Sequence, residues 1–502
     1  MVNILTIVCV LIYAVVLVLI GLRGRAAVPN AEGFLMGGRS MGPIVSLATM
    51  TMGILSGMAF FGTPALVLRQ GNLTMIVSGF GLTSFAGAWF GYKLWKYGKL
   101  YGYRTSSQYL ADQYDSPAYG KLAALVHVVF MIPYMTVQFV AVGNGLSYFT
   151  TIPFELVVFL FAALMIANML IGGAGGVSKM DVFNVLLGIA LPLILCILAI
   201  RDGGGMDRMA EMAMANDPTF LQVGAGSTFG KVGFAVFVQF LTGIFAVMFA
   251  PHLMNKMMMA KDRNSIRKTV WTGPLFYIIV CTPVQYLMAW IGIALYKPEL
   301  MESGQSDFMV QTIMSNHGNL ILNILMLCAL IAFAMSTANA FGMACANIIA
   351  TDFAEPYYQK KGIVGEEADR KILRISKLSI VVIVIACAFM SLTVSMFIND
   401  YAYALSTPGF AQLIPAVLGG LFWKRPSGKA AMASTLSGLV VLVITTYIVP
   451  QPLGIHQVIW SLGTNLAVYL IVTFATRPSK AAVEKFFPMK QEETQKSNVV
   501  AE

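Results

Sequence analysis

The strongest constraint on the fold of this chain is a succession of apolar segments that runs through almost its whole length. Of the 502 residues, 58% are hydrophobic and only 11% are charged, whereas soluble domains carry about 25% charged residues. Several segments approach or exceed the ~20 residues that an α-helix needs to cross ~30 Å of hydrocarbon. The alternating segments of a membrane-spanning barrel do not occur, so the backbone must form its hydrogen bonds within helices. The sequence therefore predicts an all-α polytopic membrane protein and excludes a soluble globular fold.

Charged residues, prolines and glycines set the boundaries of the apolar segments. These boundaries predict thirteen transmembrane helices, near residues 4–22, 43–69, 74–96, 120–149, 152–171, 180–200, 230–252, 270–296, 318–351, 373–395, 400–422, 428–449 and 454–475. The outer loop at 201–231 is expected to hold a short interfacial helix around residues 209–215.

The 33 Lys and Arg residues are distributed unevenly between the loops. If the N-terminus lies outside, the inner loops and the C-terminal tail hold 28 of them and the outer loops hold five. Because an excess of basic residues in short loops marks the cytoplasmic side, we expect an outer N-terminus and an inner C-terminus. The net charge of +10 then reflects topology, and no nucleic-acid partner is expected. Residues 1–476 are predicted to form one transmembrane domain and residues 477–502 a cytoplasmic tail.

The motifs of an enzyme or of an ATP-driven pump do not occur in this sequence. Walker A, kinase, phosphatase, haem and H-E-x-x-H signatures are missing, and no span combines a nucleophile, a base and an orienting group. The six cysteines fall inside predicted spans without a C-x-x-C pair, so neither a disulfide framework nor a thiolate metal site is predicted. Any transport must therefore draw on an ion gradient, and no obligate protein partner is evident beyond the lipid bilayer.

Two spans carry polar groups and helix-breaking residues at the same depth. Residues 52–57 (MGILSG) place two glycines four apart, and residues 332–339 (AFAMSTAN) place three polar side chains on little more than one turn. Ser56 lies fourteen residues from Gly42, and Ser336 lies sixteen residues from Asp352, so both lie roughly 21–24 Å from the inner ends of their helices. A broken helix supplies free carbonyl groups and Ser and Thr supply hydroxyls, which suit a small hard cation such as sodium. Close helix packing is the alternative explanation for these small residues.

Asp181 is the main ionisable candidate within a span, and it follows a glycine-rich run at 172–176 that should interrupt the helix. An ionisable group inside the membrane is expensive and often functional. A carboxylate near a helix N-terminus is also favoured by the macrodipole, and position alone supports both interpretations. Coupling to protons through Asp181 therefore remains an alternative to sodium.

With these features the chain resembles a sodium:solute symporter, the family of proline, pantothenate, monocarboxylate, sialic acid and sugar carriers. The resemblance covers nearly the whole chain and rests on motifs in order, at residues 34–40, 56–64, 104–114, 175–181, 251–256 and 335–352. It implies a LeuT-type core of two inverted five-helix repeats, at about 43–200 and 230–422. The function it implies is sodium-coupled import of a small organic solute.

The resemblance also implies where sodium binds. The main site would use the carbonyls of Met52, Leu55 and Phe333 and the hydroxyls of Ser336 and Thr337. Some members hold a second sodium ion, which here would involve Asp181, Ser336 and Asn339. Ala340 stands where such members carry a serine, so the sequence favours one sodium ion and leaves the second open.

The solute is expected to be a small carboxylate, such as a monocarboxylate or a pantothenate-like acid. Proline is disfavoured because Ile54, Met58 and Val247 replace the aspartate and aromatic residues of proline carriers, although other amino acids stay open. Polar residues of the core spans are predicted to orient the solute: Ser56, Thr63, Gln138, Asn144, Gln239, Thr242 and Gln412. Interhelical hydrogen bonding is the alternative for each glutamine.

The compact loops favour a bacterial inner membrane as the location. A membrane sensor that binds a solute without transporting it is an alternative function. The short C-terminal tail argues against this alternative.

Overall fold

The computed structural model describes residues 2–24, 30–71, 90–219, 245–394 and 398–487. Within these ranges the structure is helical, without named strands, and Met41 and Ala260 form an isolated backbone bridge. The elements are α1 (Val2–Gly24), α2 (Ala31–Met36), α3 (Pro43–Ile54), η2 (Met58–Gly62), α4 (Thr63–Gln70), α7 (Tyr92–Tyr101), α8 (Ser106–Gln113), α9 (Pro117–Phe149), α10 (Phe154–Asp202), α11 (Met206–Asn216), α13 (Pro251–Met258), α14 (Arg263–Phe276), η4 (Tyr277–Cys281), α15 (Thr282–Glu302), α16 (Met309–His317), α17 (Leu320–Ile348), η6 (Ile349–Ala354), α18 (Glu355–Lys360), α19 (Gly365–Ser391), α20 (Ile398–Ala411), α21 (Ile414–Phe422), α22 (Gly428–Val443), η7 (Ile444–Ile448), α23 (Gln457–Ala475) and α24 (Lys480–Phe486).

The described helices cover the predicted spans wherever both exist, but α10 runs through two spans and the loop predicted between them, and α7 and α14 extend into predicted inner loops. In the described ranges nine helices are long and apolar enough to cross a membrane, or ten if the bent pair α3 and η2–α4 counts as one span. The spans predicted at 74–96 and 230–252 lie mostly outside the described residues, so the number thirteen stays a prediction. The short helix expected near residues 209–215 is confirmed as α11.

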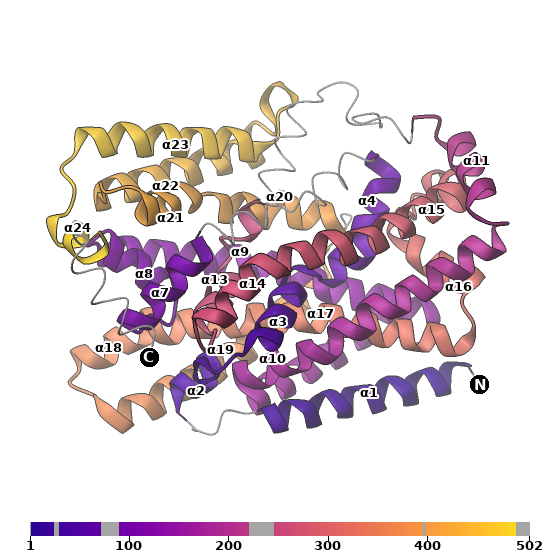
Figure 1. The fold of residues 1–502 in the computed structure, drawn as a ribbon, viewed down its shortest axis with the longest axis horizontal. Helices are drawn as coiled ribbons and strands as arrows, with labels where there is room; N and C mark the ends of the chain where they lie inside the picture. Colours follow the sequence, from indigo (N-terminus) through magenta and orange to yellow (C-terminus); the bar gives the residue numbers. More distant parts are fainter. Residues whose placement is uncertain (1, 25–29, 72–89, 220–244, 395–397, 488–502) are drawn as a thin grey trace.

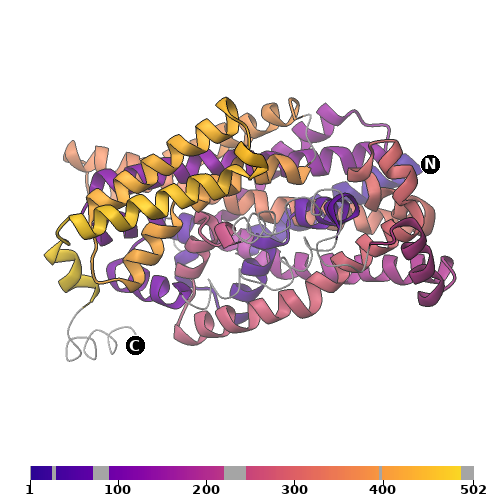
Figure 2. The same cartoon turned by 90° about the horizontal axis from the view of Figure 1, so that it is seen from above.

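The helices form an elongated bundle in which most of the long helices run along the long axis (Figures 1 and 2). In Figure 1, α1 lies along one edge of the bundle and α22 with α23 along the opposite edge. The helix α17 lies between them and packs against α3, α9, α10, α13 and α19. Its residues from Met326 to Ile348 are all buried, so α17 is the central helix of the described structure.

Glycines on the helices around α17 allow a very close approach. A Cβ atom added at Gly188 of α10 would lie 2.1 Å from Cζ of Phe333, and one added at Gly145 of α9 would lie 2.2 Å from Cδ2 of Leu330. Small residues at a helix interface let the backbones pack closely where lipid gives no hydrophobic drive. The position of α17 is therefore fixed by residues that lack a side chain.

Two breaks interrupt the long helices. The bent pair α3 and η2–α4 turns by 56° around Leu55 to Gly57. Helix α10 continues through both predicted spans at 152–171 and 180–200, but Gly173 is non-helical, with φ 56° and ψ −165°. A Cβ atom at Gly173 would lie 2.9 Å from the carbonyl oxygen of Phe34, so this position requires glycine. The predicted interruption in the glycine-rich run is confirmed.

The first part of the predicted tail packs on the bundle as α24. The Phe486 ring is buried against the rings of Tyr97 and Tyr109, with ring centroids 5.1 and 5.9 Å away. Lys485 forms an ion pair with Asp112 of α8. Residues 480–486 are therefore held by aromatic contacts that a reading of charge alone does not reveal.

Candidate ion and solute site

The break after α3 leaves backbone groups that bond to side chains instead of to the helix. Leu55 is extended, with ψ 95°, and ends α3. The amide of Gly57 donates to Oε1 of Gln138 on α9 at 3.0 Å, and the amide of Ala59 donates to Oγ of Ser56 at 3.1 Å. Because the last carbonyls of a helix lack intrahelical partners, this break exposes oxygen ligands inside the bundle.

Helix α17 meets the break directly. The hydroxyl of Thr337 donates to the carbonyl of Met52 at 3.1 Å, and the ring of Phe333 stacks on Phe60 of η2 at 4.9 Å. Leu55 and Phe333 are both buried beside this contact. The structure thus brings together the two segments that the sequence placed at the same depth.

Asp181 lies deeper in its helix than the sequence suggests, and its partners are side chains. Its two carboxylate oxygens accept hydrogen bonds from the hydroxyl of Ser336 on α17 and, at 2.5 Å, from the hydroxyl of Thr49 on α3. Asp181 is fully buried and lies eight residues beyond the break at Gly173. It therefore connects three helices and does not cap the N-terminal turn.

Lys256 of α13 completes this group and was given no role by the sequence. Its Nζ lies 3.7 Å from Oδ2 of Asp181 and donates to the carbonyl of Thr49 at 2.7 Å. Thr49, Asp181, Lys256 and Ser336 are called the central cluster below. The sequence places Lys256 in an inner loop because the predicted span ends at residue 252, but its methionine-rich surroundings, MNKMMM at 254–259, are a signal of burial.

The other predicted residues lie at different distances from the break. Ser56 and Gln138 bond to the break itself, and Thr63 lies in the next turn on α4. Asn144 is half-buried on α9. Gln412 instead donates to Ser461 at 3.0 Å and accepts from Asn465 at 3.0 Å, both on α23. Gln239 and Thr242 lie outside the described residues.

Two buried side-chain oxygens on the segments that meet at the break have no hydrogen-bond partner among the described residues, those of Asn339 on α17 and Thr51 on α3. Asn339 lies one turn from Ser336 and is not part of the central cluster. Buried polar atoms are normally paired, so this layer has spare capacity for a bound ion or solute.

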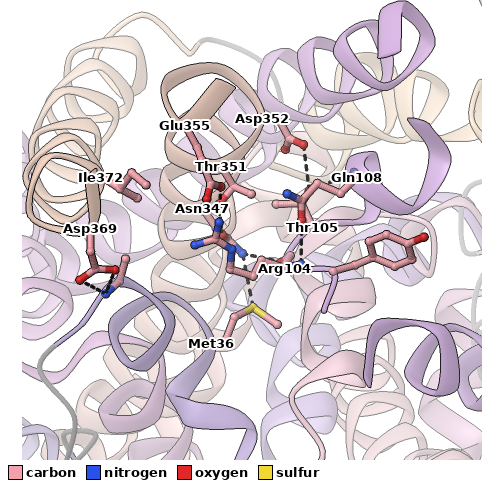
Figure 3. A network of polar contacts seen from close by, with 12 residues as sticks. Met36, Arg104, Thr105, Gln108, Asn347, Thr351, Asp352, Glu355, Asp369 and Ile372 are labelled. Atoms are coloured by element: carbon pink, nitrogen blue, oxygen red, sulfur yellow. Dashed lines mark hydrogen bonds and ion pairs between the residues drawn. The ribbon is translucent and has the colours of Figure 1, made fainter. Parts of the chain in front are cut away.

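A second polar network closes the end of α17 (Figure 3). The side chain of Asn347 donates to the carbonyl of Arg104 at 2.7 Å, and the Arg104 guanidinium forms an ion pair with Glu355. The two carboxylate oxygens of Asp352 accept from the hydroxyls of Thr105 and Ser107, each at 3.0 Å. These residues are called the end network below.

A cavity lies between α2, α10, α13 and α17. It is lined by side chains that include Leu35, Ser178, His252, Lys256, Ala340 and Ala344. Ala340 and Ala344 follow Ser336 at intervals of four residues on α17. Since residues four apart share a helix face, the cavity continues from the central cluster along α17 towards the end network.

Comparisons with known proteins agree on one family. The model of the sodium:solute symporter family matches residues 34–438. The osmoregulated proline transporter of Bacillus subtilis is 24% identical over 497 residues, covering 96% of this chain and 97% of the relative. The sodium/proline symporter of Staphylococcus aureus is 25% identical over 508 residues, covering 95% and 94% of the two chains.

Solved structures share the fold at lower sequence identity. A Na+-coupled sialic acid symporter, solved in a substrate-bound outward-open state, matches with a TM-score of 0.81 and 16% identity, covering 95% of this chain and 98% of the other. A nucleobase-cation-symport-1 family transporter in a closed conformation matches with a TM-score of 0.54 and 14% identity, covering 93% and 99%. The overall arrangement of helices is therefore that of known transporters.

Proposed function

The chain belongs to the sodium:solute symporter family, and from that premise we propose that it imports a small organic carboxylate together with sodium. It is a multi-pass membrane transporter and not an enzyme. The proposed location is the inner cell membrane, with the N-terminus outside, the C-terminus inside and thirteen spans. The proposed core is a LeuT-type pair of inverted repeats at 43–200 and 230–422, in a single transport domain that ends near residue 476.

The contact between Thr337 and Met52 carries the proposal for sodium. A hydroxyl of α17 and a carbonyl of the broken helix lie 3.1 Å apart in the buried layer. A hydroxyl has one proton and two lone pairs, so Ser336 can donate to Asp181 and still offer its oxygen to a cation. The carbonyls of Met52, Leu55 and Phe333 and the hydroxyls of Ser336 and Thr337 are the proposed ligands. Sodium bound there would hold the broken helix against α17 and favour the solute-binding arrangement.

The proposed solute site lies beside the same break. Ser56, Thr63, Gln138 and Asn144 come from the break, α4 and α9, and a half-helix N-terminus favours an anionic group. A monocarboxylate or pantothenate-like acid fits these requirements. Proline is the second candidate, because the named relatives carry it, although Ile54, Met58 and Val247 lack the polar and aromatic groups expected for it.

The test is charge movement in proteoliposomes that contain the purified full chain. An inward sodium gradient is combined with pyruvate, acetate, pantothenate, proline, other amino acids and sialic acid in turn. We expect a solute-induced current with sodium and none with potassium. A current that follows a pH gradient without sodium, and is lost in Asp181→Asn, would move the coupling to protons. Saturable solute binding without any current would instead support the sensor.

A further inference from the structure

We propose that the ammonium group of Lys256 is a tethered cation that takes the ion position beside Asp181, so that one sodium ion, not two, accompanies each solute. This inference rests on the proposed sodium coupling and adds the number of ions. It is carried by the central cluster and by the cavity next to it.

The central cluster places two opposite charges in the interior of the bundle. The side chains of Asp181 and Lys256 are only 1% and 6% exposed, with their charged atoms 3.7 Å apart. A buried carboxylate needs a counter-charge, because desolvation strongly disfavours an isolated ion. Lys256 supplies this charge without any bound metal ion.

The contacts of the Lys256 ammonium are those that an alkali cation would make in the same place. It faces the carboxylate of Asp181 and bonds to the carbonyl of Thr49. The carboxylate also accepts hydrogen bonds from the hydroxyls of Thr49 and Ser336. A second sodium at Asp181 would meet a positive charge within a few ångströms, and like charges in a buried site repel strongly.

Ala340 and Lys256 line the same cavity, so an ion beside Asp181 would take its ligands from the carboxylate itself and from the hydroxyls of Thr49 and Ser336. Asn339 keeps an unpaired side-chain oxygen and does not bond to Asp181. The Lys256 ammonium, 3.7 Å from the Asp181 carboxylate, takes the position that a second sodium ion would need beside that carboxylate.

Equilibrium binding of radioactive sodium to the purified full chain in nanodiscs tests the inference without any solute. The wild-type chain is expected to bind one sodium ion, and Lys256→Met is expected to bind two. Asp181→Asn leaves the ammonium uncompensated and is expected to weaken the main site about tenfold. The double variant Asp181→Asn with Lys256→Met is expected to recover most of that loss, because both charges are gone.

The matched control is Lys297→Met, which removes a lysine from the ion pair with Asp217 at the other end of the bundle. It is expected to bind one sodium ion, like the wild-type chain. Wild-type binding of two ions, or one ion in a folded Lys256→Met chain, would overturn the inference and leave sodium coupling intact. A double variant as weak as Asp181→Asn would also overturn it, since Asp181 would then be an ion ligand.

Absence of sodium binding to the wild-type chain would instead reject the proposed function together with this inference. If Lys256→Met does not fold, the number of sodium ions bound by the wild-type chain and by Lys256→Arg still tests whether Lys256 takes the place of a second ion. The arginine variant keeps the charge and is expected to bind one ion, and binding of two would contradict a tethered cation.

Discussion

The central cluster and the end network both bond to α17, through Ser336 and Asn347, but the polar groups next to them differ. In the end network the two carboxylate oxygens of Asp352 and the side chain of Asn347 are all paired with groups of neighbouring segments. On the two segments next to the central cluster, side-chain oxygens of Asn339 and Thr51 have no partner among the described residues. A separate bond lies nearby, in which Asp369 of α19 accepts from the backbone amide of Ala31 at 3.1 Å (Figure 3).

From this difference we propose a structural joint at the end network and a binding site at the break. A saturated network gains from staying closed, because opening it leaves buried donors and acceptors unpaired. A layer with unpaired buried oxygens is stabilised when an ion or a solute binds to them. The two regions should therefore respond to different experiments.

The largest effect is expected at the contact between α17 and the broken helix. Thr337→Ala removes a proposed ion ligand, so the sodium concentration for half-maximal uptake should rise by about tenfold or more, while Thr337→Ser keeps the hydroxyl and should stay close to the wild-type value. Sodium-dependent uptake in proteoliposomes measures both. Ser391→Ala, which removes a buried hydroxyl that donates to the carbonyl of Ala388 within α19, is the control. An unchanged sodium dependence in Thr337→Ala would mean that the site is misplaced.

The end network should control access and leave sodium affinity alone. Asp352→Ala removes the acceptor of two hydroxyls, which costs about 1–3 kcal/mol for each hydroxyl left unpaired, or about 2–6 kcal/mol in all. Labelling of Ala344→Cys in the cavity, in a chain without its native cysteines, should become several-fold faster when Asp352 is replaced. Sodium binding should change less than about twofold. A large loss of sodium affinity would show that the two regions are not separate.

Close packing around α17 predicts a smaller effect that concerns stability. Gly188→Ala places a Cβ atom against Phe333 and should lower stability by about 1–3 kcal/mol through overpacking, visible as a lower melting temperature in nanodiscs. Gly463→Ala on α23 is the matched control, since no atom lies within 4 Å of its added Cβ. Equal melting temperatures for the two variants would contradict the close approach.

The smallest effect is expected at the ion pair of Asp217 and Lys297, which lies far from both regions. Burial acts to raise the pKa of the Asp217 carboxyl, but hydrogen bonds from Lys297 and Thr219 outweigh it and hold the pKa below the usual 3.8. Because the folded pKa is lowered, this contribution to stability is present above about pH 4 and is lost as the pH falls through the folded value. Amide exchange of α11, corrected for its intrinsic rate, should therefore rise at acidic pH. Asp217→Asn should remove that pH dependence, and an unchanged dependence would assign it to another group.

The sequence predicts the spans well because apolar length is a local property. It also predicts the break at residues 52–57 and its depth relative to Ser336, because glycines and helical rise are local too. It does not predict the partners of Lys256 and Asp352, because they are distant in the sequence. Asp181 lies 75 residues from Lys256, and the hydroxyl partners of Asp352 lie at least 245 residues from it. Gln412 illustrates the same limit: its polarity places it among solute candidates, while its bonds go to α23. The ion ligands themselves stay predictions until sodium binding is measured.

The glycines that border α17 have a consequence for genetics. Selection on growth would mark Gly145 and Gly188 as intolerant to almost every replacement, although neither offers a side chain to any cargo. A mutational map of this transporter should therefore show two kinds of essential position, those that contact the cargo and those that keep empty space for a helix. Gly463, which borders no neighbour, should accept many residues and show that glycine as such is not what selection preserves.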